Sequence, residues 1–161
     1  MDTARRIPRT AAGLAVVVVL VGVLTGCTNA VMMQAAPSAN AAACAAAQVR
    51  LPETVDTKYA LRNTTAQSTA AWGDPSAALW HCGVAVPTVS DLPCVTLGSV
   101  DWIRDDRGGQ VVYTTFGRDP AVQVVIDTTK ATPSVLQDLA NAADTLPKDG
   151  HRCLDPSQVQ N

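Results

Sequence analysis

The sequence predicts an α+β fold in which a small antiparallel sheet of about four strands has N- and C-terminal helices packed on one face and is stapled by disulfides. Three observations support this prediction: strand-like runs gather in the middle of the chain, helix patterns flank them, and four cysteines follow the N-terminal region. The length of 161 residues fits one such domain.

The central runs are predicted as strands because they are apolar, β-branched and bounded by turn residues. In the last run, Val122, Val124 and Ile126 alternate with their neighbours, which is the period of a half-buried strand. Short links at 105–109 and 117–120 read as hairpin connections between antiparallel neighbours. The four main runs are 78–84, 95–104, 110–116 and 121–127, and 59–62 and 68–72 fit two further short strands.

Helices are predicted on both sides of these strands. Residues 41–50 are rich in alanine, with Asn40 as a candidate N-cap and Pro52 limiting the C-terminal end. A second helix begins at Thr132 and Pro133. Its apolar residues recur at helical spacing and give one buried face: Leu136, Leu139, Ala143 and Leu146.

The N-terminus has the pattern of an export signal over residues 1–26. Three arginines precede the uncharged stretch 11–26, which is slightly short for a membrane-spanning helix. Leu24-Thr25-Gly26-Cys27 resembles the bacterial lipobox, and this resemblance implies a lipid on Cys27 and removal of the preceding peptide. The alternatives are a retained N-terminal helix and free secretion, and all three place the domain outside the cytoplasm.

The expected organisation is therefore a signal peptide over 1–26, a lipid-anchored tether over 27–40, one domain over 41–153 and a flexible tail over 154–161. Three of the 12 basic residues and one of the 14 acidic residues precede Cys27, which leaves 9 basic and 13 acidic residues. This balance gives no electrostatic footprint for nucleic acid. We expect attachment to the cell membrane by lipid or helix, not by a basic patch.

The cysteine count agrees with export. Assigning Cys27 to a lipid leaves Cys44, Cys82, Cys94 and Cys153, which suffice for two disulfides. Four cysteines allow three connectivities. We expect Cys82 to pair with Cys94, closing a short loop, and Cys44 to pair with Cys153.

Motifs for catalysis or cofactor binding are weak. His81 and His151 lie near cysteines, but the spacings match no zinc motif, so we expect no metal and no cofactor. The sequence has no G-x-S-x-G elbow. Aspartates lie in expected turns, where such side chains usually bond their own backbone. Trp72 precedes one such turn and either packs in the core or presents its ring to a glycan or peptide.

Several short segments stand in an order that resembles the actinobacterial domain-of-unknown-function family 3515, exported membrane proteins or lipoproteins. These segments are Ala71-Trp72-Gly73-Asp74-Pro75, Cys82-Gly83-Val84, Pro87, Cys94, Val100-Asp101-Trp102 and 115–122. The family often has Arg where this chain has His81. The resemblance implies a cell-envelope location and supplies no activity. The positions to watch as a ligand or partner surface are Trp72, Asp74, Arg118 and Asp119, and Arg118 could instead pair with Asp74 or Asp119 to hold two turns together.

Two functions remain open from the sequence. The first is a non-catalytic binding or accessory lipoprotein on the outer face of the cytoplasmic membrane, with an envelope protein or the cell wall as partner. The second is a cell-wall-acting hydrolase that uses carboxylates near Trp72. The second predicts a deep cleft that holds at least two carboxylates with raised pKa values.

Overall fold

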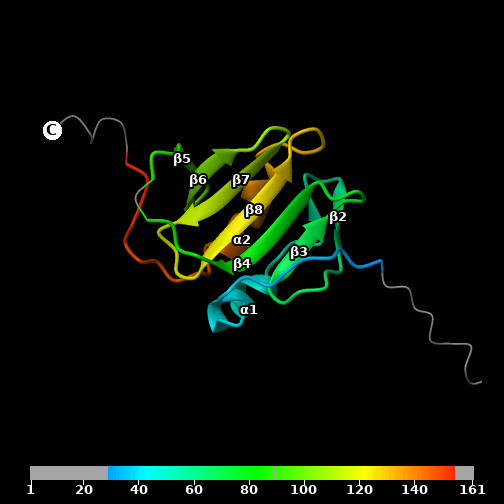
Figure 1. Cartoon of the computed structure of the whole chain (residues 1–161), viewed down its shortest axis with the longest axis horizontal. Coiled ribbons are helices and arrows are strands. Elements are labelled where there is room, and N and C mark those ends of the chain that lie inside the picture. The colour runs from blue at the N-terminus through cyan, green and yellow to red at the C-terminus, as the bar shows by residue number, and fades with distance from the viewer. Residues whose placement is uncertain (1–28, 89, 155–161) are drawn as a thin grey trace, which may run out of the picture.

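The computed structural model describes residues 29–88 and 90–154. A single eight-stranded antiparallel sheet has the order β1-β2-β3-β4-β8-β7-β6-β5 (Figure 1). The strands are β1 (Thr54–Val55), β2 (Tyr59–Arg62), β3 (Thr69–Trp72), β4 (Ala78–Val84), β5 (Cys94–Leu97), β6 (Val100–Asp106), β7 (Gln110–Phe116) and β8 (Ala121–Asp127). The helices are α1 (Ala42–Gln48) and α2 (Val135–Ala143).

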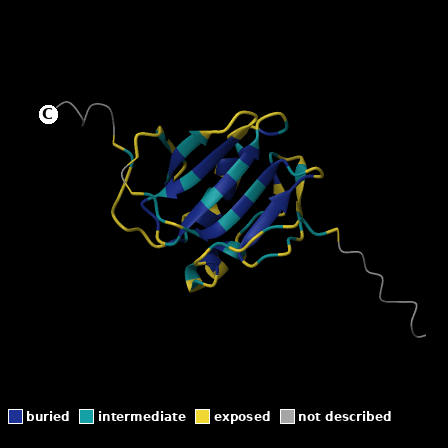
Figure 2. Cartoon of the chain, viewed as in Figure 1, coloured by how far each residue is buried: buried dark blue, intermediate teal, exposed yellow. Residues whose placement is uncertain are grey.

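Alternation along the central strands sorts side chains between two faces of the sheet. Trp80 of β4 is paired with Val124 of β8, and both are fully buried on the face that α2 covers. Figure 2 shows the resulting bands of buried and half-buried residues across the strands. The largest buried side chains of the core include Trp72, Trp80, Trp102, Leu136 and Leu139.

The prediction of an α+β fold with one antiparallel sheet, two helices and disulfides is confirmed. The expected strand number is wrong, because the sheet has eight strands and not about four. The run 95–104 is interrupted by a turn at Gly98 and Ser99, which folds β5 back onto β6. The short strands β2 and β3, together with β1, extend the sheet at the other edge.

The expected terminal helices packed together on one face are also wrong. The α1 helix has only seven residues and lies at the end of β3 and β4, whereas α2 lies behind the sheet (Figure 1). The chain continues past α2 to Cys153, so α2 does not end the fold. The cause is that α1 buries only Cys44 and Ala47, too little apolar area to cover a sheet face.

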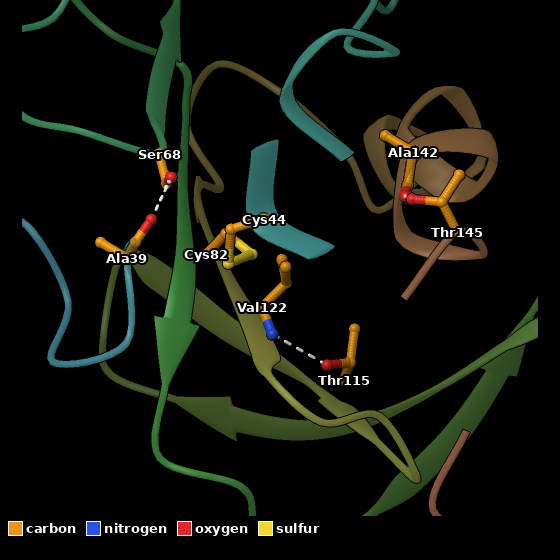
Figure 3. Close-up of a disulfide and its surroundings, with 8 residues drawn as sticks. All are labelled: Ala39, Cys44, Ser68, Cys82, Thr115, Val122, Ala142 and Thr145. Atoms are coloured by element: carbon orange, nitrogen blue, oxygen red, sulfur yellow. Dashed lines mark hydrogen bonds between the residues drawn. A yellow bond between two sulfur atoms is a disulfide. The ribbon is translucent and has the colours of Figure 1, made fainter. Parts of the chain in front are cut away.

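The segment 29–41, here called the N-terminal strap, packs on the domain. We expected residues 27–40 to be a tether, but Val31 donates its backbone N–H to Asn63 O at 2.8 Å and forms a bridge with Thr64. Ala39 is buried, and its carbonyl accepts a hydrogen bond from Ser68 Oγ at 2.6 Å (Figure 3). The folded domain therefore begins by Asn29.

The cysteines form the bonds Cys44–Cys82 and Cys94–Cys153. The expectation of two disulfides is confirmed, but the expected pairing of Cys82 with Cys94 and of Cys44 with Cys153 is wrong. The strand order explains the error, since β8, β7 and β6 separate β4 from β5. At about 4.8 Å per strand, Cys82 and Cys94 lie on strands roughly 19 Å apart, beyond the reach of a disulfide.

Within the described residues, no helix is long and apolar enough to cross a membrane. The expected signal peptide, the lipobox and Cys27 lie outside the described residues, as does most of the expected tail.

Candidate binding site beside the β7–β8 turn

The predicted surface residues Trp72 and Asp74 lie in and after β3. Trp72 is fully buried, and its indole N–H donates to Pro52 O at 3.0 Å. Asp74 is exposed in the β3–β4 turn and pairs with Arg62 at 3.2 Å. Trp72 is therefore a core side chain, and its ring offers no surface to a ligand.

The other two predicted residues, Arg118 and Asp119, lie in the turn between β7 and β8. The register places this turn far from Trp72, because Trp72 aligns with Ala78 and so with Ile126, at the far end of β8. The structure thus brings Arg118 and Asp119 together and places Trp72 and Asp74 at the opposite end of the strands.

Arg118 is buried and binds the segment 144–153, here called the C-terminal strap. Its side chain is 3% exposed, and Nη1 donates to Leu146 O at 2.8 Å and to Asp144 O at 3.2 Å. Nη2 donates to Asp144 Oδ1 at 2.6 Å and to Ser99 O at 3.3 Å. Its ion-pair partner is Asp144, not Asp74 or Asp119 as considered from the sequence. The hydrogen bond from Arg118 lowers the pKa of the Asp144 carboxyl.

Gly117 allows the C-terminal strap to pack closely against the β7–β8 turn. Its φ is +76°, and a Cβ there would overlap the carbonyl of His151. Asp149 donates its backbone N–H to Gly117 O at 3.2 Å, and Asp119 donates to Pro147 O at 3.1 Å. Backbone bonds and the Arg118 side chain together fix the strap on the turn.

A cavity of about 260 Å³ lies between this turn and the strap. Of the basic side chains that line it, Lys148 and Arg152 form no ion pair with any residue that the structure describes. The carboxylate of Asp101 is already engaged by Thr96 Oγ1 at 2.6 Å and by the Cys153 N–H at 2.8 Å. The lining residues are Ser99, Asp101, Phe116, Gly117, Arg118, Lys148, Gly150, His151 and Arg152.

The same cavity has aromatic walls. The rings of Phe116 and His151 have centroids 5.7 Å apart, and His151 Nδ1 lies 2.9 Å from Asp149 Oδ1. Two cations without an ion-pair partner among the described residues suit an anionic group, and the two rings offer apolar contact to a neighbouring part of the same ligand. The pKa of Asp149 is lowered by its hydrogen bonds with His151, so this carboxyl is not tuned to act as an acid near neutral pH.

The sequence reasoning missed Asp144, Lys148 and Arg152. A signal was present, since Lys148-Asp149-Gly150-His151-Arg152 concentrates charge next to Cys153. What the sequence could not supply is the fold of this segment back onto Gly117.

The described residues contain no group of three or more His, Cys, Asp or Glu side chains able to hold a metal ion. His81 lies on β4 opposite Gln123, and burial lowers its pKa. Its neighbour Cys82 is bonded to Cys44 and is fully buried. The structure therefore does not bring His81 and His151 together with thiolates.

Fold and site define a class: a small α+β domain on one eight-stranded antiparallel sheet, braced by two disulfides, with a basic cavity beside the β7–β8 turn. The chain belongs to the family described as "Protein of unknown function (DUF3515)", whose model matches residues 10–150. The resemblance seen in the sequence is thereby confirmed. No curated protein and no solved structure matches the chain.

Proposed function

We propose that this protein is a non-catalytic binding module of the cell envelope, held on the outer face of the cytoplasmic membrane by a lipid on Cys27. The observation that carries the proposal is the use of the cysteines. Cys44, Cys82, Cys94 and Cys153 are consumed in two disulfides, and the fifth cysteine of the chain is the one in the lipobox-like Leu24-Thr25-Gly26-Cys27. Disulfides are typical of proteins outside the cytoplasm.

The basic cavity is the place where we expect a partner to bind. Lys148 and Arg152 are exposed and unpaired within the described residues, as are Arg50 and Lys58, but only Lys148 and Arg152 lie together at this cavity. A local excess of positive charge on a mildly acidic domain favours an anionic group, such as a carboxylate of an envelope protein or of cell-wall material.

The alternative of a cell-wall hydrolase has less support. It required a cleft at Trp72 with raised carboxyl pKa values, but Trp72 is fully buried and Asp74 is ion-paired. The aspartates with resolved pKa shifts are all lowered: Asp127, Asp144 and Asp149. The geometry therefore favours binding over acid–base catalysis at the predicted positions.

The lipid is tested by metabolic labelling with an alkyne-bearing fatty acid in a bacterium that processes lipoproteins. We expect label on the parent chain and on the control variant Thr28→Ala, and none on Cys27→Ala. Cys27→Ala should also keep residues 1–26 and migrate as the larger species. An unlabelled parent chain, or equal labelling of Cys27→Ala, would contradict lipidation at Cys27.

A further inference from the structure

We propose that the N-terminal strap, together with the corner formed by β2 and the β2–β3 loop, lies against the head groups of the outer leaflet. This inference rests on the proposed lipid at Cys27 and adds the orientation of the domain to it. The occupant of the surface is the membrane itself.

The first step is the length of chain between the lipid and the fold. Only Thr28 separates Cys27 from Asn29. Consecutive Cα atoms are about 3.8 Å apart across a trans peptide, so Asn29 lies within about 8 Å of the lipidated residue. A lipid on Cys27 therefore brings the start of the folded domain to the membrane surface.

The second step is that Asn29 is fixed to the sheet edge. Arg62 Nη2 donates to the carbonyl of Asn29 at 3.1 Å and to its Oδ1 at 3.2 Å. Arg62 is itself held by Asp74 at 3.2 Å and by the carbonyl of Gly73 at 3.1 Å. Just beyond, Val31 accepts the Thr65 N–H at 3.0 Å and donates to Asn63 O. The proposed lipid on Cys27 is therefore connected, through Asn29, to the corner formed by β2 and the β2–β3 loop.

The third step is the character of this corner. Met32 is 89% exposed between two residues that bond to the β2–β3 loop, and Leu61 of β2 is 40% exposed. The strap 29–41 contains no ionisable side chain. An uncharged strap that projects a flexible thioether side chain suits contact with the boundary between head groups and acyl chains.

The orientation has a consequence for the basic cavity. The strand order puts β2 and β5 near opposite edges of the sheet, and Figure 1 shows the blue start and the red end of the described chain on opposite sides. The cavity-lining residues Phe116 and Asp101 lie on β7 and β6, four and five strand spacings from β2, which is roughly 19–24 Å at about 4.8 Å per strand. The cavity on the C-terminal strap would then face the envelope, away from the lipid.

Tryptophan quenching tests the orientation. The full chain with Met32→Trp is extracted from membranes and reconstituted in phosphatidylglycerol–phosphatidylcholine vesicles whose acyl chains are brominated near the head group. The matched control is Leu92→Trp, which replaces another exposed apolar residue, 43% exposed, in the segment before β5. The native tryptophans are buried and common to both variants. We expect at least a twofold loss of the added fluorescence for Met32→Trp and no loss for Leu92→Trp.

A third variant tests the role of the short link. Inserting a Gly/Ser linker of about 12 residues after Thr28 adds a reach of roughly 19 Å, which should abolish most of the quenching of Met32→Trp. Fatty-acid labelling and flotation of the same samples separate the two proposals. Lipidated, floating protein with equal quenching at both positions would overturn the orientation alone, whereas protein without lipid would overturn the anchor and the orientation with it.

Discussion

The two straps attach to the same sheet in different ways. Each packs tightly on a glycine of positive φ, Gly83 for the N-terminal strap and Gly117 for the C-terminal strap, and each lies near a disulfide. The N-terminal strap has no ionisable side chain, and its disulfide is fully buried. The C-terminal strap carries several charges, a half-buried disulfide and the basic cavity. The comparison indicates that the first strap combines uncharged packing with the proposed membrane contact, and that the second combines packing with the proposed binding surface.

Removing each disulfide in turn should give the largest difference in the free energy of unfolding between the two straps. The bonds span 38 and 59 residues, for which chain entropy alone predicts about 4 kcal/mol each, slightly more for Cys94–Cys153. Replacing both fully buried cysteines of Cys44–Cys82 with alanine also leaves a cavity in the core. We therefore expect the free energy of unfolding to fall by about 5 kcal/mol for Cys44→Ala/Cys82→Ala and by about 3 kcal/mol for Cys94→Ala/Cys153→Ala, where the freed strap frays. Urea unfolding measures both, and the reverse order would contradict this reading of the straps.

Substituting the two glycines on which the straps pack, Gly83 and Gly117, should give the next largest loss of stability. Alanine at Gly83 would overlap the backbone of Ser38 and Ala39, and alanine at Gly117 would overlap the carbonyl of His151. Because positive φ adds backbone strain, we expect each substitution to lower the free energy of unfolding by about 2–4 kcal/mol. The control is Gly108→Ala in the β6–β7 turn, where φ is +52° and no atom lies within 4 Å of the added Cβ. It should cost about 1 kcal/mol, and equal costs at all three positions would remove the argument from close packing.

Acidification should loosen one strap and not the other. Asp144 has a lowered pKa in the folded protein, so the stability it contributes is present above the unfolded pKa near 4 and is lost as pH falls through the folded pKa. Hydrogen exchange should show falling protection for the Asp149 and Asp119 amides below about pH 4, while the Ser38 amide, bonded to Gly83 O, keeps its protection. Asp144→Asn should reduce this difference, and the part that remains is expected from Asp149, whose pKa is also lowered. Parallel loss at both straps in the parent chain would count against the comparison.

The smallest expected effect is weak anion binding at the C-terminal strap. Titration of the ¹⁵N-labelled protein with inorganic phosphate should shift the amide signals of Gly117, Gly150 and His151, because Lys148 and Arg152 lack ion-pair partners within the described residues. Lys148→Ala/Arg152→Ala should abolish the shifts, and Arg104→Ala is a control for an ion-paired surface cation. Shifts confined to the N-terminal strap would place the anion site elsewhere.

Local patterns were sufficient to find most of the strands. The runs 78–84, 110–116 and 121–127 coincide with β4, β7 and β8, and 59–62 coincides with β2. These strands can be predicted from the sequence because alternation and turn residues are properties of neighbouring positions. The run 95–104 was read as one strand although Gly98 and Ser99, which are turn residues, stand between Leu97 and Val100.

The cysteine pairing and the cavity could not be predicted from local sequence patterns. Both depend on the strand order, in which β5 follows β4 in the sequence but lies at the edge of the sheet, and on the disulfide that joins Cys153 to β5. Arg118 was singled out, but its partner Asp144 lies 26 positions along the chain. Contacts of this kind are set by strand order, which a single sequence leaves open.

The assignment of the five cysteines is tested most directly by the intact mass of membrane-extracted protein, alkylated without reduction and again after reduction. We predict residues 27–161 plus a lipid, with no alkylation before reduction and four alkyl groups after it, on Cys44, Cys82, Cys94 and Cys153. A thiol among these four that alkylates before reduction, or a mass without lipid on Cys27, would contradict the assignment of all five cysteines.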